Sequence, residues 1–226
     1  MRPRQARLFC LVLAGALSSC ATPPESFVER IDNVEMSFVE RYVATEWLEV
    51  FWNEDGTIDE FDFLEKGIQD DDLIEVAAHP KVRILKLGQT AITDAGLAHI
   101  SGMSELVMLG LRRTRITDAG LVHVEKLHKL RSLLVAETAV TDAGLVHVAG
   151  LENLQELGLS YTAVTDAGLR HLHALPALAL LHLRGCDISE QAVAELREIY
   201  PEIVILPFDE SVHSIEMREP ESPEEN

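Results

Sequence analysis

The pentapeptide Thr-Asp-Ala-Gly-Leu occurs four times without change, at residues 93–97, 117–121, 141–145 and 165–169. The four copies start 24 residues apart, and weaker copies fall on the same period at residues 69–73 and 189–193. A fixed period of this length is typical of repeat proteins, in which each unit buries its apolar face against its neighbours. The 24-residue unit therefore decides the fold.

Apolar residues precede each pentapeptide at constant spacing. In one unit they are Leu154, Leu157 and Leu159, and Thr162 follows three residues later. Successive side chains of an extended chain point to opposite faces, so Leu157 and Leu159 share one face. This spacing predicts a short strand that ends in a turn, where the small polar side chain of Thr162 bonds backbone groups of the turn and the next.

The pentapeptide itself predicts the start of a helix. Thr165 suits the N-cap position, and Asp166 places a negative charge at the positive end of the helix dipole. Leu169 and Leu172 are three residues apart and are expected to face the core. Each unit is thus expected to contain one strand and one short helix.

The whole pattern resembles the leucine-rich repeat, with Thr or Cys186 at the position that commonly carries Asn. The Thr-Asp-Ala-Gly-Leu form is similar to bacterial ribonuclease-inhibitor-like and cysteine-containing subclasses. The resemblance covers residues 58–208 and implies an α/β solenoid of about six repeats. It implies a short, curved, right-handed horseshoe with parallel strands on the concave face and short helices on the convex face.

Both ends of the array depart from the pattern. The first unit is divergent, as terminal repeats tend to be. The last unit is aligned with one inserted residue, which places Ile203, Leu206 and Phe208 where the previous unit has Leu178, Leu181 and Leu183. Pro207 in this last strand lacks a donor for the sheet and is expected to block further stacking.

The first 19 residues have the properties of a secretory signal. Three arginines precede an apolar run from Leu8 to Leu17, which is too short to span a membrane. Leu17-Ser18-Ser19-Cys20 resembles a bacterial lipobox, and this resemblance implies cleavage before Cys20 and acylation of its amino and thiol groups, for example with palmitate. Ala21 favours the outer membrane by the same resemblance. The alternative is an ordinary signal peptide.

The remaining segments are expected to flank the array. Residues 20–26 are a short tether, and residues 27–57 are an N-terminal capping region with an amphipathic helix from about Ser37 to Trp52. A ligand-binding aromatic box is the alternative for this region. Residues 209–226 are acidic and are expected to be disordered, as a solubilising tail or a docking peptide.

The charge of the chain narrows the class of partner. The formal net charge is −19, which argues against nucleic acid or an anionic membrane surface, since both require a positive patch. Acidic excess also serves solubility alone. Only 5% of the residues are aromatic, so an aliphatic core is expected.

Two clusters suggest metal sites. His99, His123, His147 and His171 recur with the period, but a row along the convex side offers pairs rather than an enclosing site, and no metal is expected. Residues 53–62 resemble part of an EF-hand loop, with Asn53, Asp55, Asp59 and Asp62 as ligands. A turn before the first strand explains Asp55-Gly56 equally well.

The concave face is the expected binding surface. Its candidate residues alternate with the core leucines or flank them: Lys86, Met108, Arg112, Arg113, Leu134, Glu137, Glu156, Tyr161, His182 and Arg184, with Ser160 among them. Mixed charge on an acidic protein favours an acidic or mixed protein surface as partner. A solvated face without a dedicated ligand is the alternative.

These features predict a monomeric, lipid-anchored protein of the bacterial cell envelope that binds a protein partner. No catalytic motif is found, and neither enzymatic activity nor a cofactor is expected. The alternatives are a structural envelope lipoprotein and a weakly calcium-responsive acidic module.

Overall fold

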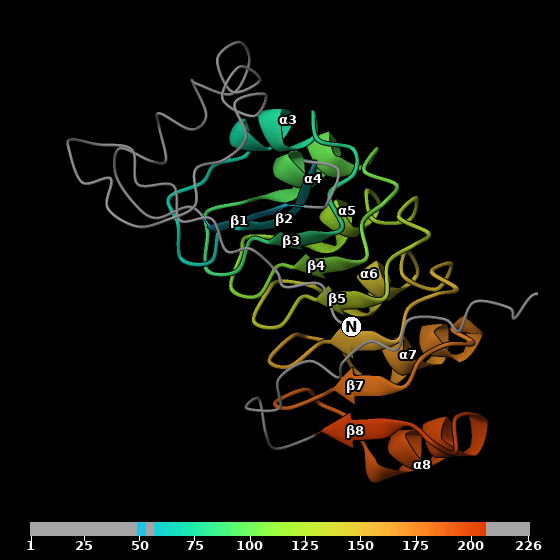
Figure 1. Cartoon of the computed structure of the whole chain (residues 1–226). Coiled ribbons are helices and arrows are strands. Elements are labelled where there is room, and N and C mark those ends of the chain that lie inside the picture. The colour runs from blue at the N-terminus through green and yellow to red at the C-terminus, as the bar shows by residue number, and fades with distance from the viewer. Residues whose placement is uncertain (1–48, 53–56, 207–226) are drawn as a thin grey trace, which may run out of the picture.

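The computed structural model describes the backbone of residues 49–52 and all atoms of residues 57–206. These residues form a sheet in which strands β1 to β8 follow one another in chain order, with short helices along one side (Figure 1). Strands β2 to β8 are parallel and the sheet is open. The fold is an α/β leucine-rich-repeat solenoid, as the sequence predicts.

The strands are short and almost equal in length. They are β1 (Glu49–Trp52), β2 (Ile58–Asp62), β3 (Ile84–Lys86), β4 (Met108–Gly110), β5 (Ser132–Leu134), β6 (Glu156–Gly158), β7 (Leu180–His182) and β8 (Val204–Leu206). The helices are α3 (Asp72–Val76), α4 (Asp94–Ile100), α5 (Asp118–Leu121), α6 (Asp142–Leu145), α7 (Asp166–Leu169), the 3₁₀ helix η1 (Arg170–Ala174) and α8 (Glu190–Ile199).

Neighbouring parallel strands pair residues that are 24 positions apart. The central residue of each strand therefore forms a continuous column through the sheet: Phe61, Leu85, Leu109, Leu133, Leu157, Leu181 and Ile205. All but Ile205 are buried in one aliphatic core. Full burial of one such side chain stabilises the fold by about 1.5–3 kcal/mol.

The threonine and aspartate of the pentapeptide link each repeat to the next. The Thr117 hydroxyl accepts the Ala119 N–H at 3.2 Å and so caps α5, as predicted. It also donates to Asp94 Oδ2 at 2.6 Å, while the Thr117 N–H donates to Asp94 Oδ1 at 2.8 Å. The same bonds join Asp70 to Thr93, Asp118 to Thr141, Asp142 to Thr165 and Asp166 to Ser189. We call this series the pentapeptide ladder.

The glycine of the pentapeptide makes room for this ladder. A Cβ atom on Gly144 would lie 2.5 Å from Asp118 Oδ1 and 3.0 Å from Leu121 Cδ1. The equivalent glycines face the aspartate of the preceding repeat at similarly short distances. Steric contact between repeats, rather than a positive φ, therefore explains the repeated glycine.

The polar residue of each turn bonds its own turn. The hydroxyls of Thr90, Thr114, Thr138 and Thr162 donate to the carbonyl three residues earlier at 2.6 Å. The Cys186 thiol instead donates to the Leu159 carbonyl of the preceding repeat at 3.1 Å. The predicted bonding within each turn is confirmed, and contact with another repeat involves Cys186, which bonds the Leu159 carbonyl and lies 3.6 Å from the Thr162 hydroxyl.

Three expectations about the ends of the array are wrong: the extent of the first helix, the inserted residue in the last repeat and the number of parallel strands. Residues 49–52 form strand β1, which pairs antiparallel with β2, so the predicted helix does not extend to Trp52. The exposed edge of β2 offers unpaired backbone groups, and satisfying them outweighs an apolar pattern of helical spacing. The rest of the predicted helix lies outside the described residues.

The last repeat contains no inserted residue. Leu181 pairs with Ile205 rather than Leu206, and the 24-residue register holds to the end of β8. The parallel strands number seven instead of about six, because both terminal units contribute one. Pro207 and Phe208 lie outside the described residues. Within residues 57–206, no helix is long and apolar enough to span a membrane.

Candidate functional site

The concave face is the side of the sheet turned away from the helices. The strand residues on either side of each core-column residue point to this face and form two columns of side chains. The first contains Glu60, Ile84, Met108, Ser132, Glu156, Leu180 and Val204, and the second contains Asp62, Lys86, Gly110, Leu134, Gly158, His182 and Leu206. The next residues along each chain form the turns at the carboxyl ends of the strands, which we call the rim.

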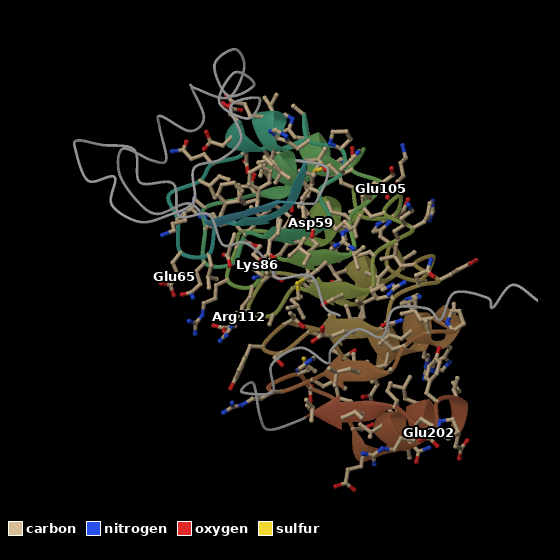
Figure 2. The ribbon with its side chains drawn as sticks, viewed as in Figure 1. Asp59, Glu65, Lys86, Glu105, Arg112 and Glu202 are labelled. Atoms are coloured by element: carbon tan, nitrogen blue, oxygen red, sulfur yellow. The ribbon has the colours of Figure 1, made fainter. Side chains whose placement is uncertain are left out.

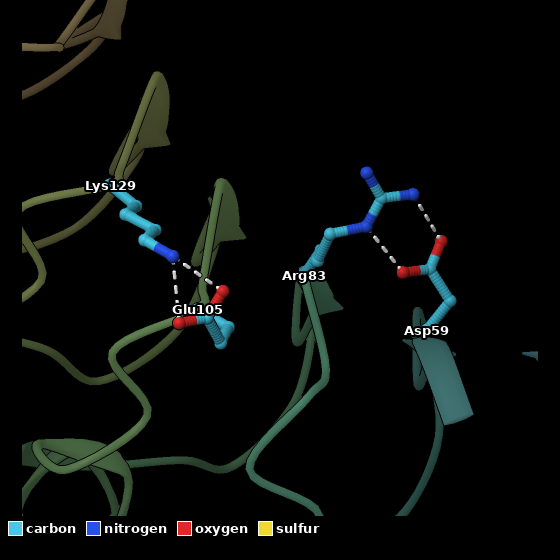
Figure 3. A network of polar contacts seen from close by, with 4 residues as sticks. All are labelled: Asp59, Arg83, Glu105 and Lys129. Carbon is cyan, nitrogen blue, oxygen red and sulfur yellow. Dashed lines mark hydrogen bonds and ion pairs between the residues drawn. The ribbon is translucent and has the colours of Figure 1, made fainter. Parts of the chain in front are cut away.

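The first strands carry a group of ion pairs. Lys86 Nζ lies 2.6 Å from Glu60 and 3.2 Å from Asp62. Burial lowers the pKa of Lys86, but the hydrogen bonds and charges of Glu60 and Asp62 outweigh it and raise the pKa above its ordinary value. At the opposite edge, where the strands begin, Arg83 forms a two-bond pair with Asp59 (Figure 3).

The middle of the concave face combines an apolar strip with a polar network. Ile84 and Met108 pair on strands β3 and β4, Leu134 lies on β5 opposite Gly110, and all three side chains are half-buried. Beside them, Glu156 accepts the Ser132 hydroxyl at 2.7 Å and lies 3.2 Å from His182 Nε2. Burial raises the pKa of Glu156, but the contacts with His182 and Ser132 outweigh it and lower the pKa.

Two arginines on the rim share one carboxylate. Arg112 Nη2 lies 2.6 Å from Glu137 Oε1, and Arg113 Nε lies 2.5 Å from Glu137 Oε2. Burial raises the pKa of Glu137, but Arg113 and Arg112 together hold it below its ordinary value. The side chains of Arg112 and Arg113 are 40% and 50% exposed, so both are partly open to solvent.

An aromatic residue on the rim is held by its neighbours. Tyr161 is 45% exposed, and the Arg184 guanidinium carbon lies 5.6 Å from the centroid of its ring, a cation–π contact. A Cβ atom on Gly185 would lie 2.4 Å from the Tyr161 ring. Gly185 therefore provides the space in which the ring lies.

The rim also has a repeated backbone conformation. Its residues Glu65, Gln89, Arg113, Glu137, Tyr161 and Gly185 all have a positive φ of 55–72°. In this conformation the N–H of each of the first five donates to a carbonyl of the next repeat at 2.6–3.0 Å. These inter-repeat bonds offset the strain of a left-handed conformation in residues other than glycine.

The structure divides the predicted binding residues into two groups. Lys86, Met108, Leu134, Glu156 and His182 lie on strands of the concave face, whereas Arg112, Arg113, Glu137, Tyr161 and Arg184 lie beyond the strand ends on the rim. We call the second group the rim cluster. The concave-face residues Glu60, Asp62, Ile84, Ser132, Leu180, Val204 and Leu206 were missed, although counting 24 residues from Met108 or Lys86 finds them.

The structure bears on both suggested metal sites, the row of histidines and the EF-hand-like residues 53–62. Within the described residues, His, Cys, Asp and Glu side chains form no group of three or more that could hold a metal ion. His99 is exposed and His123, His147 and His171 are half-buried along the helix side, as expected of a row. Asp59 and Asp62 belong to strand β2 and bind Arg83 and Lys86, so this part of the sequence does not form an EF-hand loop. Asn53 and Asp55 lie outside the described residues.

No protein-family model matches the chain, and no curated protein matches its sequence. Solved structures are similar at low identity. An internalin F from Listeria monocytogenes str. 4b F2365 has a TM-score of 0.49 and 17% identity, over 67% of this chain and 48% of that protein. An internalin C2 from the same organism has a TM-score of 0.48 and 17% identity, over 67% of this chain and 81% of its own.

A third similar structure is Pollen Receptor Kinase 3, with a TM-score of 0.48 and 12% identity over 81% of this chain and 92% of its own. The present chain thus spans about half the length of the internalin F it matches. The fold assignment depends on the strand order and the repeat register, and these similarities add no argument about function.

Proposed function

We propose that this protein is a lipid-anchored leucine-rich-repeat lipoprotein of the bacterial cell envelope, in the outer membrane, that binds a protein partner. The binding surface is the concave face together with the rim. The core column and the pentapeptide ladder hold the seven parallel strands in one register, so the surface is preorganised and little ordering cost is expected on binding.

One observation carries the binding proposal: side chains differ from repeat to repeat on the concave face and rim, while the pentapeptide is constant. The first concave column changes from Glu60 through Met108 to Leu180, and the rim changes from Glu65 to Tyr161. Such variation on a constant scaffold supplies charged, aromatic and apolar contacts at defined spacing. A protein surface is the partner that uses all three kinds of contact.

A matched pair of charge reversals tests the binding surface. Arg112→Glu with Arg184→Glu changes the rim cluster, and Lys126→Glu with Arg197→Glu makes the same charge change at exposed positions away from it. We expect crosslinking in the native envelope, followed by affinity capture, to recover one protein from the wild type and the control pair, but not from the rim pair.

Two results of this capture would contradict the binding proposal. Recovery of no protein by the wild type would support the structural-lipoprotein alternative. Equal recovery by both variants would place the binding surface elsewhere. Because the two variants carry the same net charge, a general electrostatic effect would reduce both equally.

The anchor is supported by the sequence of residues 1–20, which lie outside the described residues. A diacylglycerol on the thiol and an acyl chain on the amino group of Cys20 would attach the protein firmly, since each buried methylene contributes about 0.8 kcal/mol. We expect labelling by a palmitate analogue in the wild type and none in Cys20→Ala. We also expect globomycin to cause accumulation of the unprocessed form. An unlabelled wild type would refute the anchor.

A further inference from the structure

The rim cluster is positively charged on a strongly acidic chain. Three arginines and one glutamate give Arg112, Arg113, Arg184 and Glu137 a formal charge of +2, against −19 for the whole chain. Arg184 forms no ion pair with any described residue and contacts Tyr161 instead. The cluster therefore contains three guanidinium groups and one carboxylate, that of Glu137.

A second observation at the same place indicates a ligand. The Ser160 hydroxyl oxygen is buried and has no hydrogen-bond partner among the described residues. Ser160 is 1% exposed, directly precedes Tyr161 and lies one repeat before Arg184. An unpaired buried hydroxyl is unfavourable unless a further group accepts or donates a hydrogen bond there.

The other end of the rim has the opposite charge. At and beyond the carboxyl ends of strands β2 and β3, Glu60, Asp62 and Glu65 outnumber Lys66 and Lys86, which leaves a formal charge of −1. Figure 2 shows Glu65, Lys86 and Arg112 along the edge where the strands end. An acidic segment is thus attracted to one end of the rim and repelled from the other, which limits where it can bind.

The most acidic segment of the chain follows the last described strand, β8. Residues 209–226 contain seven acidic side chains and one arginine, a formal charge of −6. The parallel register places Leu206, the last residue of β8, next to His182, and Arg184 follows His182 by two residues. The chain therefore leaves β8 on the rim, one repeat from Arg184.

The segment is long enough to cover the whole cluster. Strands are about 4.8 Å apart, so Arg184 and Arg112, three repeats apart, are separated by about 14 Å along the rim. Eighteen extended residues span about 60 Å. Val212, Ile215 and Met217 lie among the acidic residues and are suited to pack on the exposed Tyr161 ring.

We propose that the acidic segment 209–226 binds the rim cluster of the same chain and competes there with the protein partner. This inference rests on the proposed function. Arg112, Arg113 and Arg184 bind its carboxylates, and Tyr161 contacts its apolar side chains. A tethered segment has a local concentration in the millimolar range, so it occupies the cluster until a partner of higher affinity displaces it.

A fluorescent peptide of residues 209–226 tests the proposal by anisotropy, with the full-length protein in detergent at low salt. A tail-neutral variant replaces Asp209 with Asn and the six glutamates of the segment with Gln. We expect this variant to bind the peptide about tenfold more tightly than the wild type, because the wild-type segment competes. Adding Arg112→Gln and Arg184→Gln to it should weaken binding at least tenfold, and Lys126→Gln with Arg197→Gln should not.

The possible results separate the proposal from its alternatives. Equal peptide affinity in the wild type and the tail-neutral variant would overturn it, and would show that the rim takes acidic segments only from other molecules. Absence of binding, or binding indifferent to the rim substitutions, would overturn it as well. A low-salt dimer of the wild type that the tail-neutral variant lacks would show exchange between copies, which also contradicts binding within one chain.

The capture experiment distinguishes failure of this inference from failure of the proposed function. If the acidic segment binds the rim cluster, the tail-neutral variant recovers more of the partner than the wild type does. Partner recovery that depends on Arg112 and Arg184, but is unchanged in the tail-neutral variant, would overturn the inference alone. Peptide binding without any captured partner would overturn the proposed function alone.

Discussion

The pentapeptide ladder and the rim cluster follow the same 24-residue period but use it differently. In the ladder, the aspartate of each repeat bonds the threonine or serine of the next, from Asp70 to Ser189. On the rim, equivalent positions carry Arg113, Glu137 and Tyr161, whose backbones are alike and whose side chains are not. The same spacing thus produces one surface that is constant and one that varies.

The difference follows from where the inter-repeat bonds lie. In the ladder the bonds involve side chains and leave no space beside the glycine, so a change affects two repeats at once. On the rim the bonds that fix the turns against one another are made by backbone N–H groups, such as that of Glu137 to the Ser160 carbonyl at 2.8 Å, and side-chain pairs such as Arg113–Glu137 are added to them. The rim side chains are therefore free to vary without loss of the scaffold.

The largest expected effect is that of Gly144→Ala. The new Cβ would meet Asp118 Oδ1 at 2.5 Å and Asp118 Cα at 3.3 Å, so the bonds from Asp118 to Thr141 would be displaced. We expect a loss of about 3 kcal/mol in the free energy of unfolding, measured by urea denaturation. In the matched control, Gly150→Ala, no atom lies within 4 Å of the new Cβ and no loss is expected. Equal stability of both variants would contradict this account of the pentapeptide.

The sequence predicts the part of the molecule in which spacing determines the contacts. The 24-residue period gives the strand order, the buried leucines and the cap at Thr165. The role of Asp166 was predicted only in part, because spacing shows its place at the helix start and not that its carboxylate bonds Ser189 of the next repeat. The repeat spacing identifies Arg112, Arg113 and Glu137 as binding residues. It does not predict that the two arginines share the Glu137 carboxylate, because that contact depends on side-chain rotamers.

The next largest effect is expected of Asp118→Ala. The substitution removes the acceptor of both the Thr141 N–H and the Thr141 hydroxyl, at 2.7 Å each. Hydrogen bonds to a charged group are worth about 1.5–3 kcal/mol, so we expect a loss of about 2 kcal/mol by urea denaturation. Asp118→Asn retains one acceptor and should be intermediate. Glu152→Ala, at an exposed position outside the ladder, should leave stability unchanged; a comparable loss there would contradict a specific role for the ladder.

A smaller effect, dependent on pH, is expected at the exposed last step of the ladder. The hydroxyl and N–H of Ser189 hold the pKa of Asp166 below its ordinary value of 3.8. A lowered folded-state pKa stabilises the protein above the unfolded pKa, and this stabilisation disappears as the pH falls through the folded pKa. The stability difference between wild type and Ser189→Ala should therefore be constant from neutral pH to about pH 5 and should shrink below about pH 4.

Two features of Ser189 define the control for this titration. Its hydroxyl also accepts the Ala192 N–H at 3.2 Å, and this cap of α8 does not depend on pH. A residual difference should therefore remain at low pH. Ser189→Thr keeps the hydroxyl and should titrate like the wild type, while a pH-independent difference for Ser189→Ala would show that the hydroxyl bond to Asp166 does not depend on the carboxylate charge.

The smallest effect on stability is expected on the rim, where Glu137→Gln should change the free energy of unfolding by less than about 1 kcal/mol because solvent screens exposed ion pairs. The same substitution removes the carboxylate charge that Arg112 and Arg113 share, so the tail-neutral variant carrying it should bind the 209–226 peptide several-fold more tightly in the anisotropy assay. Glu105→Gln makes an equal charge change at the pair with Lys129, at the edge where the strands begin (Figure 3), and should not alter peptide affinity.

If both substitutions strengthened binding equally, net charge rather than the rim cluster would attract the peptide. If Glu137→Gln destabilised the protein as much as Asp118→Ala does, the rim would be part of the scaffold, and the distinction between a constant and a variable surface would fail.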